Sequence, residues 1–338
     1  MIKLLLIITF IPGLTFLLQA EENSWINETI DFTINTQFDK AMLTVENQIK
    51  KNPQDYRAYF YLAATLNSKM THFENEDDYQ AFDAAIDKTL DLIDSTLEAS
   101  ETHDDSLLAD LYFYKGSAYG YRAYQQGNGG EWLAAVSNGL KSVGYLKDTL
   151  EKDSTYYGAY LGIGVYKYWR YSRLSFISWL PFVPDDREQG IEMIKQAIVL
   201  DSLSRYMAMH QLVYILLDYD SVDEAVYFAE KIVQKYPKSQ FMWWANAHAY
   251  FKKGDYNKAE KSYLTLYQLI KEDQNRNLSH LLKCNLKLAL IYKELGETQK
   301  CKERCDLNMK YTNNNSLTDP EQETISLTVA LMKDCGFI

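Results

Sequence analysis

Two short stretches, DSVDEA at 220–225 and GDYNKA at 254–259, place Ala225 and Ala259 34 residues apart. In each stretch a short polar turn precedes the alanine, and apolar residues recur at three- and four-residue spacing on both sides of it. That spacing is typical of amphipathic helices whose apolar residues share one face. The two stretches therefore predict a helix-turn-helix unit that occurs at least twice.

The second copy carries the fuller pattern of aromatic and small residues. Its two helices and the turn between them hold, in order, Trp243, Ala247, Tyr250, Gly254, Asp255, Ala259, Tyr263 and Leu266. These residues and the 34-residue period resemble the tetratricopeptide repeat (TPR) family. The resemblance implies an all-α fold, namely an α-solenoid wound as a right-handed superhelix of about six to seven TPR-like helix-turn-helix repeats.

Weaker copies flank the clearest repeats, which span 206–270. Further matches lie at Ala41, Pro53, Tyr112, Gly116, Tyr160, Ile163, Ala289 and Tyr292, and a longer partner helix is expected at 132–152. Only six prolines and 15 glycines punctuate the 338 residues, and no long alternation of Val, Ile and Thr indicates a sheet. Because a solenoid grows by stacking, we expect residues 21–338 to form one continuous domain.

The first 20 residues are typical of a secretory signal peptide. Lys3 precedes an apolar run from Leu4 to Leu18, and Ala20 offers a small residue for cleavage before Glu21. The run is short for a membrane-spanning helix, so a cleaved signal peptide at 1–20 is favoured over an uncleaved anchor. The segment predicts export to the periplasm or the cell envelope, and the chain also resembles exported bacterial TPR proteins.

The charge of the chain argues against nucleic acid as a partner. The formal net charge is −11, and removal of residues 1–20, whose only charged side chain is Lys3, takes it to −12. An acidic surface repels phosphate backbones. The densest basic run, 300–304, contains a cysteine and a glutamate, which is more typical of a solvated helix face than of a phosphate-binding patch.

No motif for catalysis, a cofactor or a metal ion stands out. The chain has no G-x-S-x-G elbow, phosphate loop or H-E-x-x-H sequence. Gly162 and Gly164 lack the third glycine of a dinucleotide loop, and close helix packing explains them better. The acidic cluster at 74–78 is expected in a solvated turn. The sequence therefore favours a protein that is not an enzyme and holds no cofactor.

All four cysteines lie near the C-terminus, and export would permit disulfides. A hairpin turning at residue 296 would bring Cys284 near Cys305, and a last helix from about residue 319 would bring Cys335 near Cys301. These two pairs are the predicted disulfides, and four buried free thiols are the alternative. A zinc site using His280 with three of these cysteines is disfavoured, because the hairpin offsets the two ligand pairs along the helix axis.

An apolar loop, 172–187, interrupts one repeat between its two helices. Phe176, Trp179 and Phe182 must either fold back onto the solenoid or contact a partner, and peripheral contact with a membrane is possible. The surrounding stretch 166–198 also resembles, locally, a eukaryotic TPR family linked to inclusion clearance and outer membranes. This loop is the predicted partner loop.

If the superhelix forms, the first helix of each repeat lines its concave wall. Side chains one helical step from the packing positions would then form an aromatic groove, and these are Phe113, Tyr121, Tyr168, Trp169, His210, Tyr214, Trp244, His248 and Phe251. Such a groove suits an extended peptide or an amphipathic helix. It contains few lysines or arginines, so a clamp for acidic C-termini is not evident.

We therefore expect a non-enzymatic scaffold that binds protein or peptide. Two alternatives stay open: an envelope component that contacts a membrane or partner through the 172–187 loop, and an enzyme without recognisable motifs. The sequence leaves the oligomeric state open.

Overall fold

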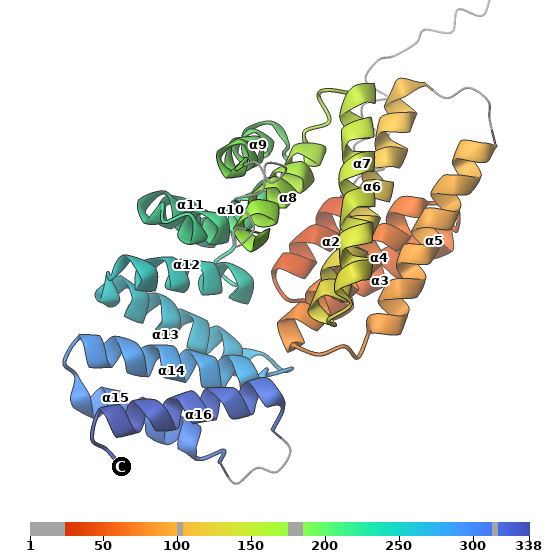
Figure 1. The fold of residues 1–338 in the computed structure, drawn as a ribbon. Helices are drawn as coiled ribbons and strands as arrows, with labels where there is room; N and C mark the ends of the chain where they lie inside the picture. Colours follow the sequence, from red (N-terminus) through yellow and green to blue (C-terminus); the bar gives the residue numbers. More distant parts are fainter. Residues whose placement is uncertain (1–23, 100–103, 175–184, 313–316) are drawn as a thin grey trace, which may run out of the picture.

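The computed structural model describes residues 24–99, 104–174, 185–312 and 317–338, and these residues form helices and no strands (Figure 1). The helices follow one another as antiparallel pairs, and a single helix ends the chain. Their bounds are α2 Ser24–Ile34, α3 Phe38–Lys51, α4 Tyr56–Phe73, α5 Tyr79–Glu98, α6 Asp105–Asn128, α7 Trp132–Lys152, α8 Gly158–Leu174, α9 Arg187–Leu200, α10 Arg205–Asp218, α11 Val222–Lys235, α12 Gln240–Lys253, α13 Tyr256–Glu272, α14 Leu278–Glu294, α15 Thr298–Met309 and α16 Asp319–Asp334. The prediction of an all-α repeat fold is confirmed.

The alanines of the two repeated stretches, 220–225 and 254–259, lie where paired helices touch. Ala225 in α11 and Ala259 in α13 are fully buried, as is Ala41 in α3. A methyl side chain at such a position lets two helix backbones approach closely without leaving a void. The 34-residue spacing thus repeats one packing position in successive helix pairs.

The turns in these two repeated stretches are explained by local backbone conformation and helix capping. Gly254 adopts φ 77°, a left-handed conformation that glycine reaches without a Cβ clash, and it ends α12. The carboxylate of Asp255 then accepts a hydrogen bond from the Lys258 backbone N–H and caps α13. In the preceding copy Asp220 takes the left-handed position, with φ 65°. These turns fix where each second helix begins.

Two glycines bring α8 and α9 unusually close together. A Cβ placed on Gly164 would lie 2.6 Å from the Gly190 carbonyl oxygen and 2.8 Å from Ile194 Cγ1. A Cβ on Gly190 would lie 2.6 Å from the Gly164 carbonyl oxygen. Gly162, in turn, leaves room for Leu146 of α7. The interpretation of Gly162 and Gly164 as close-packing residues is confirmed.

The outer face of α7 carries an apolar stripe at its N-terminal end. Four apolar side chains at helical spacing are between 58% and 91% exposed, and these are Trp132, Leu133, Val136 and Leu140.

No described helix is long and apolar enough to cross a membrane.

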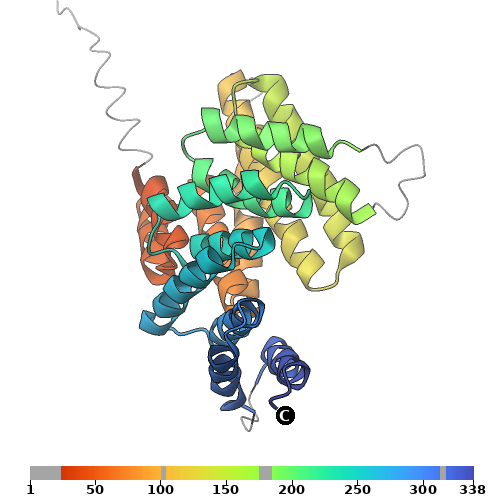
Figure 2. The same cartoon turned by 90° about the vertical axis from the view of Figure 1, so that its left-hand side faces the viewer.

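The row of helix pairs curves so that its beginning meets its second half (Figures 1 and 2). The Tyr236 hydroxyl, after α11, donates to the Asp31 carboxylate of α2 over 2.6 Å, and the Ser239 hydroxyl donates to the Ile34 carbonyl oxygen. Further along, the Asn277 amide donates to the His72 carbonyl oxygen at the end of α4. The N-terminal helices therefore lie against the N-terminal ends of α12 and α14.

Candidate functional site

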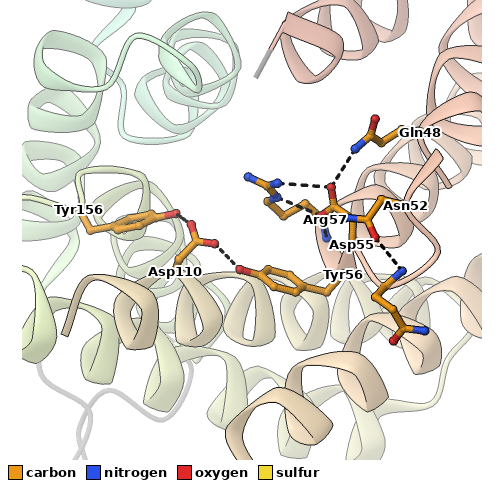
Figure 3. A network of polar contacts seen from close by, with 8 residues as sticks. Gln48, Asn52, Asp55, Tyr56, Arg57, Asp110 and Tyr156 are labelled. Carbon is orange, nitrogen blue, oxygen red and sulfur yellow. Dashed lines mark hydrogen bonds and ion pairs between the residues drawn. The ribbon is translucent and has the colours of Figure 1, made fainter. Parts of the chain in front are cut away.

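The first helices of the N-terminal pairs are joined by a carboxylate that accepts two tyrosine hydroxyls (Figure 3). Asp110 of α6 accepts from Tyr56 at the start of α4 over 2.6 Å and from Tyr156, just before α8, over 2.7 Å. Burial, and then the charge of Asp110, raises the pKa of both tyrosines well above the usual range. Both hydroxyls therefore remain donors, and the cluster ties three repeats together.

A second carboxylate fixes the turn between α3 and α4 (Figure 3). Asp55 is 5% exposed and accepts the Arg57 backbone N–H over 3.1 Å, which caps α4. The Arg57 guanidinium pairs with the same carboxylate at 3.0 Å, and the Gln48 amide donates to it at 3.0 Å. Since each group has a partner within the chain, this network is structural.

Replacing Asp110 with asparagine should destabilise the protein by about 1–2 kcal/mol. The amide oxygen can still accept one tyrosine, but the amide nitrogen cannot accept the other, which leaves a buried hydroxyl without an acceptor. Urea unfolding of Asp110→Asn measures the loss. Asp91→Asn, at an exposed position of α5, makes the same chemical change and should be neutral. Equal stabilities of the two variants would contradict the structural role of Asp110.

The predicted groove residues of the N-terminal half pack against other aromatic rings. Phe113 packs on Tyr156 with ring centroids 4.7 Å apart, and Tyr121 lies 5.7 Å from Phe60. Tyr168 is fully buried, and its hydroxyl donates to Asp218 over 2.6 Å. The prediction that Tyr168 lines the groove is therefore wrong, because its ring fills the core. Trp169 packs edge-on against the Tyr168 ring at 5.1 Å.

The predicted groove residues of α10 and α12 lie close together. The His210 and Tyr214 rings are 5.2 Å apart, and the Tyr214 and His248 rings are 6.3 Å apart. Trp244 meets the His280 ring of α14 at 5.5 Å. Phe251, one turn beyond His248, lies under the Lys287 ammonium, 4.9 Å from its ring centroid. All five predicted residues in these two helices are half-buried.

The N-terminal helices cover one end of this group of aromatic side chains on α10 and α12. The ring of His72 packs 4.9 Å from His280 and 5.4 Å from Phe241. Glu74 accepts from the Ser279 hydroxyl over 2.7 Å and pairs with Lys283. Glu74 is thus not in a merely solvated turn: its partners lie more than 200 residues along the chain. No local pattern in the sequence indicates this contact.

Farther along α14, beyond this contact, a pocket of about 640 Å³ opens between α12, α14 and α16. Its apolar lining includes Trp244, Leu286 and Leu290. Three lysines of α14 also line it, Lys283, Lys287 and Lys293. No local sequence pattern indicates these lysines as site residues, because α14 follows the clearest repeats and its weak repeat pattern does not align it with Trp244.

The four cysteines are free thiols, so neither predicted disulfide is present in the structure. Cys284 points toward α13 and donates to the Tyr263 carbonyl oxygen at 3.2 Å, which contradicts its pairing with Cys305. Cys301 contacts Cys335, its predicted partner, and also Cys305. Burial raises the pKa of Cys301 to about 12 and that of Cys305 to about 11, so both are protonated near neutral pH.

Several predicted features lie outside the described residues. They are the signal peptide (1–20) and the partner-loop residues Phe176, Trp179 and Phe182. Within the described ranges, no group of three or more His, Cys, Asp or Glu side chains could hold a metal ion.

No protein-family model and no curated protein matches the sequence. Similar solved structures include the C-terminal part of a TPR repeat-containing protein from Cytophaga hutchinsonii, at 13% identity over 89% of this chain and 98% of that one, with a TM-score of 0.47. A thermophilic TPR protein from Thermus thermophilus is 18% identical over 68% of this chain and 99% of its own, with a TM-score of 0.43. The quorum sensor NprR from B. thuringiensis is 14% identical over 94% and 82%, with a TM-score of 0.48. These are likenesses of fold alone, and the described residues of the chain form an all-α protein of repeated helix pairs.

Proposed function

We propose that this protein is a non-enzymatic scaffold that binds a protein or peptide along the inner face of its first helices. The observation that carries the proposal is the pocket bounded by Trp244 and by α14 and α16, about 640 Å³ in volume. Its lining combines apolar side chains with a few charged ones, as in sites where apolar contact gives affinity and polar groups give orientation. The pocket is large enough for several side chains of a bound segment.

The cellular place of the scaffold is part of the same proposal. The N-terminal apolar run supports export to the periplasm or the cell envelope, and the net charge of −11 supports a partner other than nucleic acid. N-terminal sequencing of the protein purified from its native cells tests the export step. A mature chain beginning near Glu21 is expected, and an intact Met1 on a cytoplasmic protein would contradict it.

Trp244→Ala should abolish detectable peptide binding. The substitution removes an aromatic side chain from the pocket wall, and such residues commonly dominate binding at interfaces. Binding of the wild-type protein and the variant to an array of random peptides measures the change. The matched control is Trp132→Ala, which removes an indole that is 69% exposed on α7, far from the pocket in sequence. Circular dichroism checks that both variants fold.

The same array can contradict the proposal. If the wild-type protein enriches no peptide sequence, or if Trp244→Ala and Trp132→Ala retain the same peptides, the inner face is not the binding surface.

A further inference from the structure

The lysines of α14 differ in what they pair with. Lys283, near the start of the helix, pairs with Glu74 at the end of α4. Lys293, near its end, pairs with Asp334 of α16. Lys287, between them, has no carboxylate partner among the described residues. The chain's own carboxylates therefore pair with the first and last of these three lysines, here called the lysine row, and leave the middle one without an anion.

The surroundings of Lys287 favour an anion there. Its side chain is half-buried, and its ammonium lies 4.9 Å from the centroid of the Phe251 ring. Burial lowers the pKa of Lys287, and its charge adds to burial in lowering the pKa of His248. A cation partly removed from water is stabilised by a nearby opposite charge. Phe251 supplies only the weaker attraction of an aromatic face.

Leucines line the pocket on two sides, and α16 also contributes the carboxylates of Glu323 and Asp334. Leu286 and Leu290 come from α14, and Leu327 and Leu331 come from α16, with Leu327 52% exposed. The leucines of α14 lie on the same helix as Lys283, Lys287 and Lys293. A ligand with a carboxylate next to apolar side chains could therefore satisfy both kinds of surface at once.

We infer that the pocket between α12, α14 and α16 binds an acidic peptide segment, with a carboxylate on Lys287 and neighbouring apolar side chains against the leucines of α14 and α16. This inference rests on the proposed function and adds the chemistry of the partner. Long-range attraction cannot account for such binding, because a chain with a net charge of −11 repels acidic peptides as a whole. The affinity must come from the local site.

A pair of peptides that differ only in charge tests the inference. The probe is a short fluorescein-labelled peptide of alternating leucine and glutamate, and its control has glutamine at every glutamate position. Fluorescence anisotropy at physiological salt should give a Kd for the glutamate peptide about tenfold lower than for the glutamine peptide, since the ion pair with the Lys287 ammonium is replaced by a hydrogen bond to a neutral amide.

Substitutions of Lys287 test whether this residue is responsible for the preference for the glutamate peptide. Lys287→Met keeps the length of the side chain and removes its charge, so it should raise the Kd of the glutamate peptide about tenfold and leave that of the glutamine peptide unchanged. Lys147→Met, at an exposed position of α7, is the matched control and should change neither value. Lys287→Arg should retain the preference for glutamate.

The outcomes separate this inference from the proposed function. If both peptides bind equally and Trp244→Ala abolishes both, the scaffold function stands and the acidic preference is overturned. Failure of the glutamate peptide to bind, or its unchanged affinity for Lys287→Met, also overturns the inference. Enrichment of peptides without acidic residues on the random array, lost in Trp244→Ala, would leave the scaffold function intact.

Discussion

Lowering the pH from about 7.5 to about 5 should reduce the free energy of unfolding by about 4 kcal/mol through two buried histidines in contact, about 2 kcal/mol each, and by about 2 kcal/mol more through His210, whose pKa burial lowers to about 4. His72 of α4 and His280 of α14 are 1% and 7% exposed, and their rings lie 4.9 Å apart where the N-terminal helices meet α14. Burial lowers the pKa of His72 to about 4 and that of His280 to about 3, and the charge of His72 contributes to the second shift.

The sign follows from the proton binding of the two states. An unfolded histidine titrates near pH 6.5, so between that pH and about 4 the unfolded state binds more protons than the folded state. Stability is therefore full above pH 6.5 and is lost progressively as the pH falls through that window. The charged groups around the pair are Glu74, Asp273 and Lys283. The two carboxylates favour a protonated His72, but their effect is smaller than that of burial.

Urea unfolding at the two pH values measures this loss. The variant His280→Phe keeps an aromatic ring in the contact and removes one titrating group, so its pH dependence should be about 2 kcal/mol smaller. A wild-type stability that does not change between the two pH values, or an equal pH dependence in His280→Phe, would show that the pair stays accessible to protons in the folded state.

Gly164→Ala should destabilise the protein by about 2 kcal/mol. Overpacking of a tight contact destabilises the fold by more than the higher helix propensity of alanine stabilises it. The added methyl group would lie 2.6 Å from the Gly190 carbonyl oxygen, which belongs to the backbone and cannot rotate away. The helices α8 and α9 would have to separate, and Ile194 and Tyr168 at their contact would lose packing.

Gly139→Ala is the matched control, since it makes the same change in the interior of α7. A Cβ at Gly139 has no neighbour within 4 Å, so the substitution should stabilise the helix by about 0.5–1 kcal/mol. Thermal or urea unfolding of both variants gives the comparison. If Gly164→Ala is as stable as Gly139→Ala, the close crossing of α8 and α9 does not exist in solution.

The correct predictions are those that depend only on residues close together in the sequence. The helix at 132–152 and the buried alanines 225 and 259 were predictable, because helical spacing and turn chemistry depend on neighbours within a few positions. The terminal helix from Asp319 was predictable for the same reason, since Thr318 and Glu321 form a capping box at its start.

The errors concern side chains whose surroundings come from distant helices. Tyr168 was assigned to the groove from its position on one helix, but its side chain is fully buried and its hydroxyl donates to Asp218, an exposed residue 50 positions away. The pairing of Cys284 with Cys305 was wrong because the rotation of α14 about its axis, which the sequence does not specify, turns the thiol toward Tyr263. Helical spacing predicts which residues share a face, but not which neighbour that face meets.

The sequence by itself determined the repeat unit, its turns and the positions where paired helices touch, because these follow from interactions within about 34 residues. Only the tertiary structure decided how the first helices close against α12 and α14 and which lysine of α14 has no carboxylate partner among the described residues. Glu74 and Lys283 are 209 positions apart, and Lys293 and Asp334 are 41 apart. Such pairs depend on the accumulated curvature of the whole row of helices, to which every repeat contributes a small rotation.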